Sequence, residues 1–214
     1  MSAQQARMDR IYKLQRHIYD LTRRLFLPGR DRLLERMQLE GHERVLEIGC
    51  GTARNLVRLA RRHPALRLYG VDASGEMLKT ARRKARGHPI VLVHALGQEF
   101  EYARCPAFDA IFCSYSLSMM PGWEPVLERA LAALPRGGRL YVVDFWDQRD
   151  LPAWFGRLLR AWLGLFHVRY EPRLLETLER WRAEGQIELE VVPVCKRYAY
   201  RATIEKRRSG GWSA

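Results

Sequence analysis

The sequence of 214 residues lacks the marks of several large protein classes. No apolar run approaches the roughly 20 residues that a membrane-spanning helix needs, and the opening MSAQQARMDR has no apolar stretch of the kind found in signal peptides. The cysteines are scattered, without a CxxC pair and without histidines at metal-ligand spacing; they are Cys50, Cys105, Cys113 and Cys195. We therefore expect a cytoplasmic chain with reduced thiols and no metal site.

Acidic residues are scarce relative to basic ones. The chain has 24 Asp and Glu against 37 Lys and Arg, so its net charge is +13 and its isoelectric point is near 10.1. This excess favours an anionic partner, which is a nucleic acid, an anionic membrane surface or an acidic substrate. A basic surface that reflects only an arginine-rich composition is the alternative, and charge alone does not separate these cases.

Apolar runs rich in β-branched residues alternate with helical patterns, which predicts an α/β fold with a mostly parallel sheet and helices on both faces. Seven strands are expected, the last two as a reversed hairpin, at Arg44–Ile48, Arg67–Val71, Ile90–His94, Ala107–Ser114, Arg139–Phe145, Ile187–Pro193 and Arg197–Glu205. Helices are expected near Ala53–Arg62, Gly75–Ala85, Pro125–Leu134 and Pro172–Glu184.

Three parts follow from this pattern. Residues 1–43 are expected to form an N-terminal helical cap over the active site. Residues 44–208 are the core, with an inserted amphipathic helical region near 151–184, and residues 209–214 are a flexible tail. One domain is expected from a chain of this length.

The segment VLEIGCGTARN, residues 45–55, reads as a buried strand that ends in a glycine-rich turn and opens into a helix. Gly49 and Gly51 let the backbone approach a ligand closely at the carboxyl end of the strand. A dinucleotide-binding loop makes the same demand, but here Arg54 stands where GxGxxG has its third glycine. Glu47, two positions before Gly49, suits a cationic amino-acid moiety and would repel a pyrophosphate. The segment resembles motif I of class I methyltransferases, ExGxGT, with Ala53 in place of a common third glycine.

Further residues fit S-adenosylmethionine. Asp72 follows Gly51 by 21 positions, where a carboxylate accepts from both ribose hydroxyls, and Ser74 is the expected N-cap of a helix that packs Met77 near the adenine. HALGQEF resembles the family's GDAxxF turn but has Leu96 in place of the aspartate, so adenine would meet backbone groups of Leu96–Gly97 or the side chain of Gln98. The predicted cofactor-binding set is Glu47, Gly49, Cys50, Gly51, Asp72, Ala73, Met77, Leu96, Gly97 and Ser114. The fold expected from this resemblance is the Rossmann-like class I methyltransferase fold.

The turn after the fourth strand, FDAIFCSYSLSMM, bears on the acceptor. It lacks the [DN]PP[YF] turn of base amino-methyltransferases, and Cys105–Pro106 reverses the Pro-Cys order of cytosine C5 enzymes. A nucleic-acid substrate is thereby disfavoured, although rRNA ribose enzymes stay open. The segment Leu151–Phe166 places Trp154 and other aromatics on an apolar stripe bordered by arginines. This is the composition of a helix in a membrane interface, or of one that covers the sheet.

Three segments together resemble the bacterial diacylglycerylhomoserine N-methyltransferases of betaine-lipid synthesis. They are MDRIYKLQRHIYDLTRRLFLPGRDRLL, SYSLSMMPGW and VVDFWDQRDLPAWF. The resemblance covers roughly Met8 to Arg207. It implies three successive methyl transfers to the homoserine amine of a diacylglyceryl lipid, at the cytoplasmic face of an anionic membrane. Phosphatidylethanolamine N-methylation is the nearest rival; quinone C-methylation, RNA methylation and a non-catalytic membrane-surface protein are further alternatives.

The acceptor amine must be neutral when it attacks, so positioning and desolvation are expected to supply most of the rate. Aromatic faces stabilise the cation that forms. The candidate catalytic residues, for such a cage or for moving the proton, are Tyr12, His17, Tyr19 and Tyr115. The candidate substrate-binding residues, arginines for the carboxylate and tryptophans for the cage or the lipid, are Arg16, Arg23, Arg30, Trp146 and Trp154. Asp20 and Arg24 are expected to orient the N-terminal helix or to meet the cofactor carboxylate.

Overall fold

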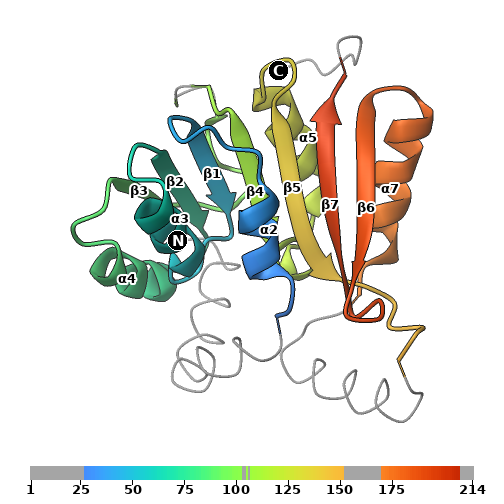
Figure 1. Cartoon of the computed structure of the whole chain (residues 1–214), viewed down its shortest axis with the longest axis horizontal. Helices are drawn as coiled ribbons and strands as arrows, with labels where there is room; N and C mark the ends of the chain where they lie inside the picture. The colour runs from blue at the N-terminus through green and yellow to red at the C-terminus, as the bar shows by residue number, and fades with distance from the viewer. Residues whose placement is uncertain (1–26, 103–104, 106, 152–169, 208–214) are drawn as a thin grey trace.

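A seven-stranded sheet forms the centre of the molecule (Figure 1). The computed structural model describes residues 27–102, 105, 107–151 and 170–207. The strands are β1 Arg44–Ile48, β2 Arg67–Asp72, β3 Ile90–His94, β4 Ala110–Ser114, β5 Arg139–Phe145, β6 Ile187–Val194 and β7 Ala199–Lys206. Their order in the sheet is β3-β2-β1-β4-β5-β7-β6. Strands β1 to β5 pair in parallel, whereas β7 runs antiparallel to both β5 and β6, which confirms the predicted reversed hairpin.

Helices cover both faces of the sheet (Figure 1). They are α2 Arg30–Arg36, α3 Arg54–Arg62, α4 Gly75–Lys84, α5 Trp123–Ala133 and α7 Pro172–Ala183, with the short 3-10 helix η2 at Leu117–Met119. Apolar residues of α2, α3 and α4 pack on one face, and those of α5 and α7 pack on the other. The central strands are therefore buried on both sides, which explains why β4 is a continuous apolar run instead of an alternating one.

Most predicted elements are confirmed to within two or three residues, and the exceptions have local causes. The predicted N-cap is confirmed, because the Ser74 hydroxyl accepts from the Met77 amide at 3.3 Å. Strand β7 begins at Ala199 and not at Arg197, because Cys195, Lys196 and Arg197 all have positive φ and form the turn of the hairpin. Strand β4 begins three residues later than predicted, at Ala110.

Three predicted regions lie wholly or largely outside the described residues. Of the helical cap predicted over residues 1–43, the structure describes α2 and the chain around it. The amphipathic helix at 151–166 falls in the undescribed stretch 152–169, and the predicted tail at 209–214 is also outside. Within the part of the chain that the structure describes, no helix has the length and apolar character needed to cross a bilayer.

Candidate functional site

The glycine-rich loop after β1 is held close to β2 and to the turn after β4. The amides of Gly49 and Cys50 both donate to the Val71 carbonyl, at 2.8 and 3.0 Å. Gly49 has a φ of 75°, and a Cβ built on it would lie 2.4 Å from the Cβ of Ser116. A larger residue at this position would therefore be strained and would push the two loops apart. The loop folds as the motif predicted because only glycine fits here.

Glu47 lies beneath this loop. Its side chain is buried, with 1% of its surface exposed, and its Oε1 accepts from the Asn55 Nδ2 at 2.7 Å. Asn55 is itself buried in α3. A buried carboxylate needs such hydrogen bonds because desolvation otherwise disfavours its charge. The structure thus gives Glu47 a contact with α3, whereas the sequence predicted a contact with a cationic ligand.

Asp72 stands at the end of β2, and two backbone amides fix its carboxylate. Gly51 donates to Oδ2 at 2.7 Å and Ser74 donates to Oδ1 at 2.8 Å. A carboxylate accepts about four hydrogen bonds in all, which is why an acid at this position suits a diol. The structure thus joins the glycine loop to this acid by a direct hydrogen bond, and the predicted contact of Asp72 with ribose stays a prediction.

A cleft that opens to solvent lies at the carboxyl ends of β1 to β4. Open α/β sheets bind ligands at this edge. The lining consists of two loop glycines, one carboxylate, small and apolar residues, and one tyrosine: Gly49, Gly51, Val71, Asp72, Ala73, Met77, Ala95, Leu96, Gly97, Gln98, Tyr115, Ser116, Met119, Met120 and Pro121. Asp72 is the one carboxylate among these lining residues.

The structure brings most of the predicted cofactor-binding residues together around this cleft. Those in its lining are Gly49, Gly51, Asp72, Ala73, Met77, Leu96 and Gly97, together with Gln98. Three others are not among the lining residues: Glu47, Cys50 and Ser114. The Cys50 side chain lies against Gly70, and burial, reinforced by the carboxylates of Asp72 and Glu47, raises the pKa of its thiol well above the ordinary value. Cys50 is therefore a packing residue and not a nucleophile.

One wall of the cleft was not predicted as part of the cofactor site. It is formed by the turn after β4, through Ser116, Met119, Met120 and Pro121. The Ser116 hydroxyl donates to the Ile48 carbonyl at 2.8 Å and ties this wall to β1. Of this turn, the sequence predicts only Ser114 as a cofactor residue, because nothing in the local sequence indicates that the Ser116 hydroxyl lies next to the glycine loop.

A buried acid on β5 supports the same wall. Asp144 is 1% exposed, and its Oδ2 accepts from the Ser118 amide in η2 at 3.0 Å. Its Oδ1 accepts from the Phe145 amide at 2.8 Å. Burial raises the pKa of the Asp144 carboxyl, while the amides of Ser118 and Phe145 oppose that rise. Asp144 thus connects η2 with the end of β5.

Among the predicted acceptor residues that the structure describes, Tyr115 lines the cleft. Its hydroxyl donates to the Pro28 carbonyl at 2.6 Å, and burial raises the pKa of this phenol well above the ordinary value. The phenol is therefore a poor base as placed. Arg30 is buried at the start of α2.

Trp146 does not line the cleft. The Arg197 guanidinium lies 4.0 Å from the centroid of its ring, and Arg197 also pairs with Asp147. The ring thus already faces a cation from its own chain.

The other acceptor residues lie outside the described residues, and their roles stay predictions: Tyr12, Arg16, His17, Tyr19, Arg23 and Trp154, with Asp20 and Arg24. Among residues 27–102, 105, 107–151 and 170–207, no three His, Cys, Asp or Glu side chains come together as metal ligands.

The cleft fits a nucleoside with a small charged appendage. Asp72 presents a carboxylate to a diol, Met77 and Leu96 offer apolar surfaces to a flat base, and Gly49 leaves room for a ligand beside the loop. These are the contacts expected of a site for S-adenosylmethionine, and none of them depends on the identity of the methyl acceptor.

Comparison with known proteins agrees. A family model described as a methyltransferase domain matches residues 45–138. The chain is 32% identical over 126 residues to trans-aconitate 2-methyltransferase of Rhodopseudomonas palustris, covering 59% of this chain and 47% of that one. It is 27% identical over 219 residues to demethylmenaquinone methyltransferase of Geobacillus stearothermophilus, covering 90% of this chain and 88% of that one. The chain thus spans about half the length of the first relative and most of the second.

A solved structure has the same fold. It is phosphoethanolamine N-methyltransferase 2 of Haemonchus contortus, in complex with S-adenosyl-L-methionine. The two superpose with a TM-score of 0.70 at 15% sequence identity, over 85% of this chain and 54% of that one. The predicted Rossmann-like class I methyltransferase fold is confirmed.

Proposed function

This chain has a class I methyltransferase domain with S-adenosylmethionine as its cofactor, and from that premise we propose that it N-methylates the amine of diacylglycerylhomoserine. Bound S-adenosylmethionine supplies an electrophilic methyl group. The residues that would hold it are Gly49, Gly51, Asp72 and Met77, with Leu96 and its neighbours around the base. The acceptor nitrogen would form the new bond to the methyl carbon with its lone pair while the carbon–sulfur bond breaks, its electron pair going to sulfur and S-adenosylhomocysteine leaving. The amine must therefore arrive without its proton.

The observation that carries the choice of acceptor is the position of SYSLSMMPGW. This segment, Ser114 to Trp123, is one of the three that resemble the betaine-lipid methyltransferases. In the structure it contributes Met119, Met120 and Pro121 to the cleft lining, together with Tyr115 and Ser116. Residues specific to the acceptor are expected in this turn, and the two methionines and the proline give it an apolar surface, as suits a lipid amine that must be stripped of water.

The ionisation of the lining residues also supports this chemistry. Asp72 is the one lining carboxylate, and two backbone amides hold it next to the glycine loop. The Tyr115 phenol is buried and hydrogen-bonded. The described part of the cleft therefore provides surface and orientation in place of a strong base, which suits an amine that loses its proton to water.

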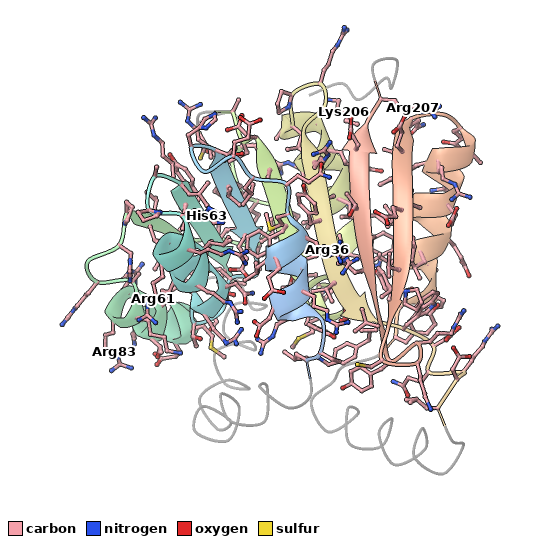
Figure 2. All side chains as sticks on the ribbon, viewed as in Figure 1. Arg36, Arg61, His63, Arg83, Lys206 and Arg207 are labelled. Carbon is pink, nitrogen blue, oxygen red and sulfur yellow. The ribbon has the colours of Figure 1, made fainter. Side chains whose placement is uncertain are left out.

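We also propose an anionic membrane as the partner surface, on the basis of the charges on α3 and α4. From Arg54 to Arg86 the chain has ten Lys and Arg but only two acids, Asp72 and Glu76. Exposed cations gather at the ends of these helices, and we call them the basic face: Arg61, Arg62, Arg82, Arg83, Lys84 and Arg86. Figure 2 shows Arg61 and Arg83 on this side of the molecule, away from β6 and β7.

The substrate is tested by incubating the protein with labelled cofactor and separate acceptors. The acceptors are diacylglycerylhomoserine, phosphatidylethanolamine, demethylmenaquinone, trans-aconitate and an RNA mixture. We expect label in diacylglycerylhomoserine, with mono-, di- and trimethylated products resolved by mass spectrometry. Label confined to any of the other acceptors would refute the proposed substrate. An Asp72→Ala variant serves as the control for activity that does not come from this cleft.

The membrane proposal is tested with charge-reversed variants. Each juxtamembrane cation contributes about 1 kcal/mol to binding of an anionic bilayer, so Arg61→Glu with Arg82→Glu should weaken flotation with phosphatidylserine vesicles by more than tenfold. The matched control, Arg136→Glu with Arg180→Glu, makes the same change of charge at exposed sites elsewhere. Equal effects of the two pairs, or RNA binding without vesicle binding, would argue against the basic face as a membrane surface.

A further inference from the structure

The loop after β3 forms the adenine side of the cleft, and it lacks the acid that its family pattern carries. Leu96, Gly97 and Gln98 line the cleft, with Leu96 in the position of the usual aspartate. Recognition of the base would then use backbone groups of this loop or the side chain of Gln98, and the positions of both depend on how the loop is held. The loop begins with a hydrogen bond from the Ala95 amide to the Asp72 carbonyl at 3.2 Å.

Helix α5 supports this loop from below through two residues on one face. A Cβ on Gly97 would lie 3.2 Å from a methyl carbon of Val126, so the loop backbone rests directly on the helix. Arg129 comes three residues after Val126, which places both side chains on the same side of the helix. Helix α5 therefore presents an apolar contact and a cation to adjacent parts of one loop.

The Arg129 guanidinium joins three points of the loop. It donates through one nitrogen to the Gln98 carbonyl and through the other to the Phe100 carbonyl at 3.1 Å. Its central carbon lies 5.8 Å from the centroid of the Tyr102 ring, and the Phe100 side chain is anchored in the core. A guanidinium bonds two acceptors at once because its donors are planar and fixed.

We propose that Arg129 is a positioning residue for the adenine side of the cofactor cleft, and that it takes over the ordering of the loop that lacks its aspartate. Arg129 holds the Gln98 and Phe100 carbonyls outward, which directs the backbone between Leu96 and Gln98 toward the base. This inference rests on the cofactor and not on the acceptor, so failure of the proposed lipid substrate would leave it standing.

The test compares two ligands by calorimetry: S-adenosylhomocysteine and the analogue with hypoxanthine in place of adenine. The analogue replaces a hydrogen-bond donor on the base with an acceptor, so it reports on the groups that read the base edge. Because hydrogen bonds from a charged donor contribute measurably to net stability, Arg129→Gln should weaken the adenine ligand by roughly three- to tenfold. It should also reduce the preference for adenine over hypoxanthine.

Matched variants separate positioning from general damage. Arg129→Lys should give a smaller loss, because an ammonium group lacks the planar fork that spans both carbonyls. Arg136→Gln removes the same charge at an exposed turn and should leave both affinities unchanged. Equal weakening of both ligands, wild-type affinity in Arg129→Gln, or no preference for adenine in the wild type would each overturn the proposal.

Discussion

Asp72→Asn tests whether the acid at the end of β2 holds the cofactor. Each carboxylate oxygen accepts one backbone amide, from Gly51 and from Ser74, at 2.7 and 2.8 Å. The substitution replaces one oxygen with an amino group, which then faces an amide donor instead of accepting from it. Hydrogen bonds to a charged group contribute roughly 1.5–3 kcal/mol, and Asp72 is only half-buried, so a loss of stability toward the lower end is expected.

The effect on the cofactor adds to this loss. The same substitution removes one acceptor for a ribose hydroxyl together with the charge, so the dissociation constant of S-adenosylhomocysteine should rise by about 10- to 100-fold. Calorimetric titration measures that constant, and urea unfolding without ligand measures the stability term separately. The two measurements distinguish loss of a ligand contact from loss of loop structure.

Asp109→Asn is the matched control. Asp109 also accepts a backbone amide, that of Arg44 at 2.8 Å, but it lies before β4 and outside the cleft lining. This variant should lose some stability and keep its cofactor affinity. The assigned role of Asp72 fails if both variants lose affinity equally, or if Asp72→Asn binds the cofactor as the wild type does.

Three further outcomes are expected. Gly49→Ala should lower cofactor affinity at least tenfold and reduce the melting temperature, because its Cβ would collide with Ser116 at 2.4 Å; unchanged titration and melting curves would contradict this. Burial raises the pKa of the Asp144 carboxyl, so the native state binds a proton there more readily than the unfolded state does. Ionised Asp144 therefore lowers the free energy of unfolding above the folded pKa, and this loss is relieved as the pH falls. The free energy of unfolding of Asp144→Asn, relative to that of the wild type, should therefore be higher at about pH 7 than at about pH 4 in urea unfolding. A difference that does not change with pH would be evidence against this effect of Asp144. Tyr115→Phe should cost about 1 kcal/mol through the lost bond to the Pro28 carbonyl and lower turnover less than fivefold; a loss near a thousandfold would instead identify the phenol as catalytic.

Local patterns were sufficient for most of the sheet. Strands β1, β3 and β5 have the bounds that their apolar runs predicted. For the central strands β1 and β5 this is because a buried strand needs little more than such a run between turns. The error at β7 arose at Cys195, Lys196 and Arg197, whose positive φ values make a turn without glycine. The residue types at these positions do not predict such a turn, because its conformation is imposed by the pairing of the two strands.

In the cofactor site too, some residues could be predicted from the sequence and some contacts could not. Gly49, Gly51 and Asp72 were predicted because the loop and the next strand end carry their chemistry in short, regular spacing. The contact of Glu47 with Asn55 was not predicted, because it depends on the packing of α3 against the sheet, and the role of Glu47 toward the cofactor stays a prediction. The acceptor residues of the N-terminal segment and Trp154 lie outside the described residues, and their roles stay predictions.

By itself, the sequence determined that this chain is an α/β protein whose first strand ends in a loop for S-adenosylmethionine. A strand, a glycine turn and an acid one strand later are encoded by neighbouring residues and need no distant partner. Only the tertiary structure decided what holds that loop and the neighbouring loops of the cleft in place. Ser116 reaches the carbonyl of Ile48 across 68 positions, Asp144 reaches Ser118 across 26, and Arg129 reaches Gln98 across 31. Such partners meet because the sheet brings its carboxyl ends to one edge, and no local pattern records that meeting.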